Sequence, residues 1–547
     1  MSNLYKPFIP NSNILKDSKL IGINVGYTSF EVIEYYNGLD TISSLTKFLV
    51  SYTRVRKKKL KYSNGKFDYE YIPDKKFYGR RETLNGDIIY KFPISLYASY
   101  LKILEDLRID RDKIEITLDR NLEYDKLNLT WNTDYILRDY QDDYINGYLS
   151  IKSPVGLLDM ATGTGKTVTG CKLLHMLHSK FLVLVKGVYI EKWIEDVKKY
   201  FSDLKDEEIF VIRGYGSLEK LFNTKKEDLP YKVYIMSVTT SSSYIDSYEN
   251  GDMIYDTAQD PNPTNTVLFG YDDGPLTITP DKFLNHLGVG VMLVDEMHQH
   301  YYGVYRTILY FNPIKVIGLT ATLISNEKNM MNLYNVLLGE DGRISDKLEI
   351  QAYCDYETFS YNLPTTKRFK YNGGMGYMHA EFEKSIMSNH SLLQFYLKMI
   401  EDKIKKEYID NRQEDDKAII YIATIALCNI VKDYLSGAFP NISVDQYIGT
   451  DRYDKIMSAD LCVTNVIKAG AALDIPNLIR VFMTIPMISN QANLQTYGRL
   501  RKLKDREVKF ISFRCLDIEP HKVMENSRVQ QLKNKIRVRS SETYFNQ

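Results

Sequence analysis

Short apolar runs alternate with helix-length polar segments along two stretches of the chain. From about residue 130 to 325, β-branched or Leu-rich runs such as GLLDM, FLVLV, IFVIR, KVYIMSV, VMLVD and KVIGLTAT are separated by longer polar pieces. A second series begins near residue 417 with AIIYIA and continues through ISVDQYI, DLCVTNV, LIRVFMT and VKFISF. Such alternation is typical of parallel strands covered by helices. The pattern therefore predicts two α/β domains.

The remaining segments differ in character. Residues 326–416 are mostly helical in pattern, with apolar positions recurring at three and four, and we expect a connector plus the opening helix of the second domain. Residues 247–281 are rich in Gly, Pro, Asn and Asp, which indicates an extended loop inserted in the first domain. The expected parts are an N-terminal α+β module at 1–130, the first α/β domain at 131–350, the second at 351–525 and a C-terminal tail at 526–547.

Composition excludes several classes of protein. With 71 Lys and Arg against 70 Asp and Glu, the net charge is +1, so any polyanion site must be local. The five cysteines form no Cys-x-x-Cys pair, which argues against zinc and against a disulfide framework. The chain shows no signal peptide and no apolar run long enough to span a bilayer, so we expect a cytoplasmic protein without membrane contact.

One local basic segment stands out. Arg54 to Lys91 contains twelve Lys and Arg residues against five acidic ones, a net charge of +7, with seven aromatic residues interleaved. Cations between aromatic rings suit phosphate contact with base stacking, although 44 tyrosines in the chain weaken the aromatic signal. A solvated hairpin turning at Asn64-Gly65 explains the same pattern, and both can be true. The candidate nucleic-acid contacts here are Arg54, Arg56, Lys57, Lys58, Lys59 and Lys61.

A phosphate-binding loop is predicted at residues 156–167, GLLDMATGTGKT, where an apolar run meets a Gly-rich turn and a helical pattern. Gly163 and Gly165 allow backbone N–H groups around Thr164 to turn toward a phosphate. Lys166 would reach the β and γ oxygens, and the Thr167 hydroxyl would ligate Mg²⁺. This context favours a nucleotide site.

Two acids end a later apolar run in GVMLVDEMHQHYY. Asp295 can hold Mg²⁺ through its waters, and Glu296 can activate an attacking water. We interpret His298 as a coupling residue hydrogen-bonded across the site, with metal ligation as the weaker alternative. Thr320 and Thr322 then supply two hydroxyls in a following loop.

The order of the motifs LRDYQ, MATGTGKT, DEMH, TAT, TNVIKAGAALD and QTYGRLRK resembles that of superfamily 2 helicases and translocases. The resemblance covers roughly residues 137–515. It implies two RecA-like domains, with ATP and Mg²⁺ bound between them and nucleic acid crossing both.

The resemblance also implies roles for particular residues. Gln141 would read adenine with Arg138 nearby, and Thr320 and Thr322 would couple hydrolysis to domain movement. Gln495 would face the nucleotide and Arg499 would act as an arginine finger, while Arg501 and Lys502 both remain candidates for a second finger. Further contacts with nucleotide or nucleic acid are implied for Lys186, Ser237, Thr239, Thr240, Thr464, Gly470 and Asp474. Trp193 is expected to pack in the core.

Among the subgroups, phage branch-migration helicases and poxvirus-like transcript-release helicases are the most similar, because the HRIGRTGR-type ending of DEAD-box RNA helicases is missing. The resemblance and the basic segment favour a viral or phage motor that remodels duplex, forked or branched DNA without reading sequence. An RNA-directed or transcript-release helicase remains an alternative. An ATP-dependent clamp or adaptor with little turnover is a third hypothesis, disfavoured because Lys166, Glu296 and Arg499 are all present.

Overall fold

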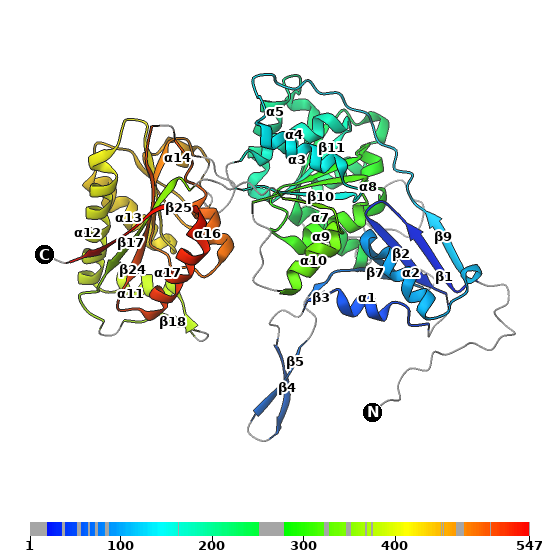
Figure 1. The fold of residues 1–547 in the computed structure, drawn as a ribbon, viewed down its shortest axis with the longest axis horizontal. Coiled ribbons are helices and arrows are strands. Elements are labelled where there is room, and N and C mark those ends of the chain that lie inside the picture. The colour runs from blue at the N-terminus through cyan, green and yellow to red at the C-terminus, as the bar shows by residue number, and fades with distance from the viewer. Residues whose placement is uncertain are drawn as a thin grey trace, which may run out of the picture. The chain divides into compact units, whose positions relative to one another are not determined.

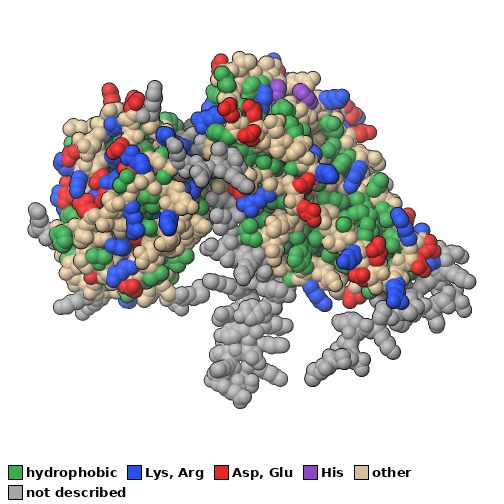
Figure 2. Space-filling view, in the orientation of Figure 1, with side chains coloured by type: hydrophobic (Ala, Val, Ile, Leu, Met, Phe, Trp, Pro, Cys, Tyr) green, Lys and Arg blue, Asp and Glu red, His purple; other side chains and the backbone are tan. Residues whose placement is uncertain are grey.

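The computed structural model of the chain describes residues 19–35, 39–51, 56–63, 66–71, 75–82, 87–161, 164–250, 278–321, 328–345, 352–366, 369–373, 376–449, 451, 453–466, 475–503 and 505–545. It comprises two compact units, Met1–Asp346 and Lys347–Gln547 (Figure 1). On the face shown in Figure 2, basic and acidic side chains are intermingled over both units, in keeping with the net charge of +1. None of the helices in the described ranges is long and apolar enough to cross a membrane.

A seven-stranded parallel sheet forms the centre of the first unit, in the order β12-β13-β11-β14-β15-β10-β16. Its strands are β10 (Val155–Asp159), β11 (Phe181–Val185), β12 (Ile209–Ile212), β13 (Val233–Ser237), β14 (Val291–Val294), β15 (Lys315–Thr320) and β16 (Arg343–Ser345). Strands β11, β13 and β14 are buried along their whole length, as expected for a sheet covered on both faces. The first predicted α/β domain is confirmed.

Helices connect and cover these strands: α3 (Asp139–Ser150), α4 (Lys166–Leu177), α5 (Ile190–Tyr200), α6 (Tyr215–Phe222), α7 (Val238–Asn250), α8 (Pro280–Leu287), α9 (Tyr301–Phe311) and α10 (Lys328–Leu338). Helix α8 begins with proline at its first position and ends at Gly288, whose φ is +67°. The predicted loop at 247–281 was therefore too long, because its first residues complete α7 and its last begin α8. Residues 251–277 lie outside the described residues.

The N-terminal module has a five-stranded sheet in the order β7-β8-β2-β1-β9, with helices α1 (Ser43–Phe48) and α2 (Tyr97–Asp106). Its strands are β1 (Ile21–Val25), β2 (Ser29–Glu34), β7 (Gly79–Glu82), β8 (Ile88–Pro93) and β9 (Ile114–Leu118). A short pair, β3 (Val50–Ser51) with β6 (Lys75–Lys76), lies at the base of an antiparallel hairpin, β4 (Arg56–Ser63) with β5 (Lys66–Tyr71). The predicted hairpin is confirmed, while its turn at Asn64-Gly65 and Arg54 lie outside the described residues.

The module packs against α9 of the first α/β domain. Tyr305 donates a hydrogen bond from its hydroxyl to the Phe77 carbonyl over 2.8 Å. The Asn312 side chain, at the end of α9, accepts from the backbone N–H groups of Tyr27 and Thr28 at 2.7 and 2.9 Å. The middle and the C-terminal end of α9 thus hold the module, and the helix itself starts three residues after His298.

A second parallel sheet of seven strands forms the other unit, in the order β21-β22-β20-β23-β24-β17-β25. Its strands are β17 (Cys354–Tyr361), β20 (Lys417–Tyr421), β21 (Val444–Tyr447), β22 (Leu461–Thr464), β23 (Leu478–Met483), β24 (Val508–Cys515) and β25 (Ile536–Tyr544). The second predicted α/β domain is confirmed. The fold is α/β, with two RecA-like sheets and a small N-terminal α+β module.

Two predictions about this unit were wrong. The helical connector expected at 326–416 contains β17, a strand paired on both sides within the sheet. The C-terminal tail expected at 526–547 contains the second half of α17 and all of β25, which pairs with β17 and closes the sheet at that edge. The other helices are α11 (His379–Met387), α12 (His390–Glu407), α13 (Ile425–Ala438), α14 (Tyr453–Ser458), α16 (Asn490–Tyr497) and α17 (Glu519–Leu532), and a short hairpin joins β18 (Asn372–Gly373) to β19 (Gly376–Tyr377).

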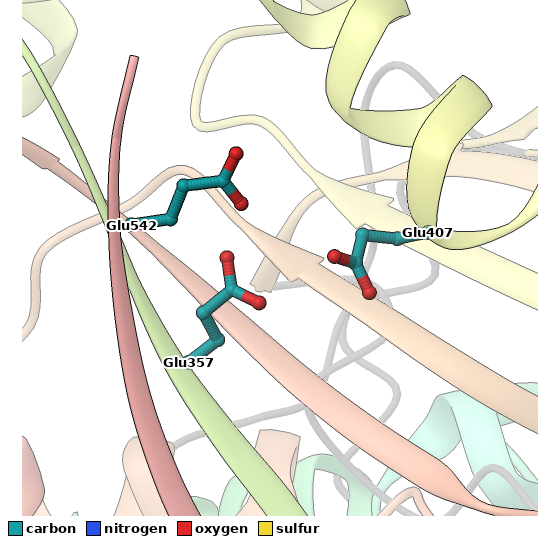
Figure 3. Close-up of side chains that lie close together, drawn as sticks. All are labelled: Glu357, Glu407 and Glu542. Atoms are coloured by element: carbon teal, nitrogen blue, oxygen red, sulfur yellow. The ribbon is translucent and has the colours of Figure 1, made fainter.

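A cluster of carboxylates lies where β17, β25 and the end of α12 meet. Oxygens of Glu357, Glu407 and Glu542 lie within 4.8 Å of one another (Figure 3). The Lys403 ammonium contacts all three, at 3.0 Å from Glu407 and 2.7 Å from Glu542, and Lys509 pairs with Glu357 and Glu407. Because lysines already neutralise the cluster, it is an ion network that fastens β25 to α12 rather than a metal site.

Candidate nucleotide-binding site

The predicted phosphate loop joins β10 to α4, and its last glycine is required by the backbone. Gly165 has a φ of +85° and directly precedes the helix, which begins at Lys166. A Cβ atom at Gly165 would lie 2.3 Å from Nε2 of Gln141. The first turn of α4 carries Lys166 and Thr167 and presents its backbone N–H groups beyond the sheet edge, an arrangement that favours an anion. Gly163 lies outside the described residues.

Opposite charges face each other across this loop. Nζ of Lys166 lies 3.9 Å from Oε1 of Glu296, and both side chains are nearly buried. Glu296 itself follows the end of β14 with a φ of +46°, which is uncommon for a non-glycine residue and found most often at functional sites. Its Oε2 is buried and has no hydrogen-bond partner among the described residues. A buried acceptor without a partner is suited to hold a water beside the phosphate loop.

Asp295 occupies the position between β14 and Glu296. Burial raises the pKa of Asp295, as does the neighbouring charge of Glu296, whereas Lys192, the Trp193 indole and Lys166 oppose the shift. The indole Nε1 of Trp193 donates to Oδ2 of Asp295 over 2.8 Å. Sequence reasoning missed this contact, because the position of Trp193 on the buried face of α5 indicated core packing alone.

His298 and Thr320 meet behind the two acids. Nδ1 of His298 lies 2.6 Å from the Thr320 hydroxyl, which ends β15, and 3.5 Å from Oε2 of Glu296. Burial lowers the pKa of His298 to about 4, so its ring is neutral at pH 7. The structure thus brings a predicted coupling pair into contact with the predicted base. Thr322 lies outside the described residues.

The LRDYQ motif lies against the phosphate loop. Gln141 is buried in the first turn of α3, where its Oε1 accepts from the Arg138 N–H at 2.9 Å and its Nε2 donates to the Thr164 carbonyl at 2.8 Å. Tyr140, which sequence reasoning did not single out, donates from its hydroxyl to the same carbonyl at 3.0 Å. Gln141 therefore holds the loop in place, while Arg138 stays exposed.

Three hydroxyls predicted to contact nucleic acid are instead used within the fold. Ser237 and Thr240 are buried with their hydroxyls 2.7 Å apart, and Thr240 accepts from the Gly214 N–H at 2.8 Å. Thr464 is buried and donates to the Tyr447 carbonyl at 2.6 Å. Their positions at strand ends let them satisfy backbone groups of neighbouring loops, so of the four predicted hydroxyls only that of Thr239 belongs to an exposed residue. Lys186 is half-buried at the end of β11.

The candidate residues of the second unit lie at the end of α16. Arg499 is 4% exposed and close enough to Tyr421 for its charge to affect that phenol's pKa. Gln495 is half-buried, Arg501 donates to the Gly498 carbonyl, and Lys502 is exposed. Gly470 and Asp474 lie outside the described residues, and so do the side chains of the basic hairpin, among them Arg56, Lys57, Lys58, Lys59 and Lys61.

One known protein family matches the part of the chain that contains this site. Residues 134–325 fit the family model described as "Type III restriction enzyme, res subunit". That span runs from α3 to the end of β15 and includes the phosphate loop, both acids and the His298–Thr320 pair. The second parallel sheet then carries the remaining motifs in the expected order. Together, the matched family and the arrangement of the site support a superfamily 2 helicase.

The chain is also similar, over a short stretch, to two curated viral proteins. It is 31% identical over 103 residues to Nucleoside triphosphatase I of Choristoneura biennis entomopoxvirus. It is 30% identical over 103 residues to the protein of the same name from Choristoneura fumiferana entomopoxvirus. Each match covers 18% of this chain and 16% of the relative, so the helicase matches only a small part of these longer proteins.

Among solved structures, the helicase overlaps with S. cerevisiae Dbp5 bound to RNA and ADP BeF3, at a TM-score of 0.48 and 11% identity over 74% of this chain and 90% of that one. The crystal structure of T4 UvsW overlaps at a TM-score of 0.33 and 13% identity, over 96% of this chain and 99% of that one. Both TM-scores lie below 0.5. The strand order of the two parallel sheets, and not these overlaps, defines the fold.

The donors present in the helicase fit a nucleotide with its metal ion. The α4 N-terminus and Lys166 supply positive potential for phosphates, and Thr167 and Asp295 supply the oxygen ligands that Mg²⁺ prefers. The partnerless Oε2 of Glu296 lies beside them. Hydroxyl and carboxylate oxygens of this kind suit a hard cation such as Mg²⁺ better than a softer metal.

Proposed function

We propose that this helicase hydrolyses ATP when bound to nucleic acid and uses the energy to translocate on duplex, forked or branched DNA. The observation that carries the proposal is the meeting of Lys166, Glu296 and the His298–Thr320 pair at the carboxyl edge of one parallel sheet. These residues follow or end three different strands, β10, β14 and β15, so their convergence depends on the fold and not on one motif.

Each side chain has a defined task in this proposal. Lys166 and the N–H groups of α4 bind the β- and γ-phosphates, and a bound Mg²⁺, held through Thr167 and Asp295, would neutralise phosphate charge. Glu296 orients the attacking water with Oε2 and accepts its proton. The Lys166 ammonium also pairs with the nearly buried Glu296, at 3.9 Å from Oε1.

Neutral His298 supports coupling between the site and β15. The ring touches both Glu296 and Thr320, so a displacement of Glu296 when the γ-phosphate leaves would be felt at the end of β15. The roles of Thr322, Gln495 and Arg499, and the choice between Arg501 and Lys502, stay predictions.

A positively charged surface near this edge supports a polyanion partner. Burial lowers the pKa of His300, and the charges of Lys186 and Lys75 lower it further, so these three side chains share one neighbourhood. Lys186 directly follows β11, whereas Lys75 belongs to β6 at the base of the basic hairpin. The N-terminal module therefore adds positive charge next to the motor, which favours DNA bound along both.

Comparing nucleic acids as activators of ATP hydrolysis tests the proposal. Duplex, forked or four-way DNA is expected to stimulate hydrolysis at least about tenfold more than single-stranded RNA of equal length, and forked DNA is expected to be unwound or remodelled. Stronger stimulation by RNA would favour the RNA-directed or transcript-release alternative. Tight binding of DNA without measurable turnover would favour the clamp.

Charge on the hairpin is expected to govern the salt dependence of DNA binding. Replacing Lys57, Lys58 and Lys59 together with glutamine should lower the slope of log affinity against log salt by about 2 to 3, since each lost phosphate contact removes about 0.9. The triple arginine variant keeps the charge and should retain the slope. Fluorescence anisotropy with a labelled duplex at several salt concentrations gives both slopes, and an unchanged slope in the glutamine variant would remove the hairpin from the DNA site.

A further inference from the structure

Trp193 makes a direct hydrogen bond to Asp295. It lies on α5, is fully buried, and donates its indole N–H to Oδ2 of Asp295 over 2.8 Å. Ile190, Val197 and Tyr200 share the same buried face of the helix, which explains the burial of the ring but not the hydrogen bond. Phenylalanine would be sufficient if the residue only packed in the core. Holding the carboxylate requires a hydrogen-bond donor, and the indole N–H supplies it.

The hydrogen bond from Trp193 restricts the orientation of the Asp295 carboxylate. Asp295 lies beside a second carboxylate, Glu296, and burial disfavours its charge. The hydrogen bond from Trp193 engages Oδ2 of Asp295 over 2.8 Å. The indole therefore fixes the rotation of the carboxylate and leaves one oxygen for another ligand. Outer partners of this kind orient metal ligands and raise affinity by about 10- to 100-fold.

We propose that Trp193 is a positioning residue for Mg²⁺: its indole N–H orients Asp295 so that Oδ1 faces the metal, and its ring therefore senses whether Mg²⁺ and nucleotide are bound. This inference rests on the proposed ATPase function. The residue touches neither nucleotide nor attacking water, and it acts only through Asp295.

Replacing Trp193 with phenylalanine removes the N–H and keeps an aromatic ring in the core. The magnesium concentration that gives half-maximal ATP hydrolysis should rise about 10-fold or more, while kcat at saturating magnesium stays within about threefold of wild type. ADP affinity measured by calorimetry in EDTA should not change, but its strengthening by Mg²⁺ should shrink. A purely structural role would lower the melting temperature and leave the magnesium dependence unaltered.

The chain provides a matched control, because Trp131 is its only other tryptophan. Trp131 stacks on Tyr200 at 5.9 Å and donates to the Tyr135 carbonyl at 3.2 Å, away from both acids. Trp131→Phe should keep the magnesium dependence of wild type. It also leaves Trp193 as the sole indole, so its emission should change when ADP and Mg²⁺ are added together and stay constant when ADP is added in EDTA.

The outcomes separate this inference from the proposed function. If wild type hydrolyses ATP and Trp193→Phe requires no more magnesium than wild type, the positioning role is wrong and the ATPase stands. If Trp193→Phe fails to fold, constant emission of Trp131→Phe on addition of ADP with Mg²⁺ overturns the inference. If wild type itself shows no magnesium-dependent hydrolysis, the proposed function fails first.

Discussion

Glu296→Gln is expected to slow ATP hydrolysis by about 10²- to 10⁴-fold while nucleotide binding persists, because an amide cannot accept the proton of the attacking water. Binding of ATP should hold or tighten, since the substitution removes one of two adjacent buried negative charges from a site that receives phosphates. Single-turnover hydrolysis with radiolabelled ATP measures the chemical step, and equilibrium dialysis with ATP measures binding.

The control for this substitution is another nearly buried carboxylate of the same unit. Glu249 on α7 pairs with Arg306 and accepts from the Tyr310 hydroxyl, remote from the phosphate loop in sequence and in its partners. Glu249→Gln should affect stability and leave the hydrolysis rate within about twofold. A Glu296→Gln protein that hydrolyses ATP within about fivefold of wild type would refute the assigned base.

Lys403→Met is expected to destabilise the second unit by about 3–5 kcal/mol, because it leaves carboxylates without their buried cation. The Lys403 side chain is 1% exposed and pairs with Glu357, Glu407 and Glu542, joining α12 to β17 and β25 (Figure 3). Urea denaturation followed by circular dichroism measures the loss. Lys398→Met on the same helix is the matched control: Lys398 is 54% exposed and pairs with Glu401 and Asp402, so the expected cost is below about 1 kcal/mol.

The same network predicts a dependence on pH. Burial opposes the charge of Glu542, yet hydrogen bonds from Lys403 and Lys406 hold its pKa at about 2, below the value of about 4.3 in an unfolded chain. A carboxylate with a lowered pKa stabilises the fold above its unfolded pKa and stops doing so as pH falls through the folded one. The gap in melting temperature between wild type and Lys403→Met should therefore narrow from pH 5 toward pH 2. A gap that is constant over this range would contradict the role of Glu542.

The sequence predicted the strands with continuous apolar cores and missed those with buried polar residues. FLVLV and VMLV are recognisable because every side chain is apolar. In β17, Glu357, Thr358 and Ser360 are buried yet polar. Their burial is possible because Glu357 pairs with Lys403, Thr358 donates to Glu525, and Ser360 accepts from Arg514. Because those partners belong to other elements, the pattern of apolar residues within β17 does not predict a strand. Strand β25 lies at the sheet edge with most of its side chains exposed. Its sequence is therefore mostly polar, which is why it was predicted to be a tail.

The site divides in the same way. Motif spacing alone located Lys166, Asp295 and Glu296 at the ends of strands that a parallel sheet brings to one edge. Motif spacing could not predict the contact between Trp193 and Asp295. These two residues are 102 positions apart in the sequence and meet only when α5 packs on the sheet. Nor could it tell that Ser237 and Thr464 would turn inward, because a hydroxyl at a strand end can serve the backbone or a ligand equally well.

The central claim, a nucleic-acid-dependent ATPase built around Lys166, is tested most directly by steady-state ATP hydrolysis of the full chain with and without duplex DNA, in wild type and in Lys166→Ala. The account predicts magnesium-dependent hydrolysis that DNA raises at least about tenfold, and its loss to background in the variant. Hydrolysis that is equal in the two proteins, or that no DNA or RNA stimulates, would contradict it.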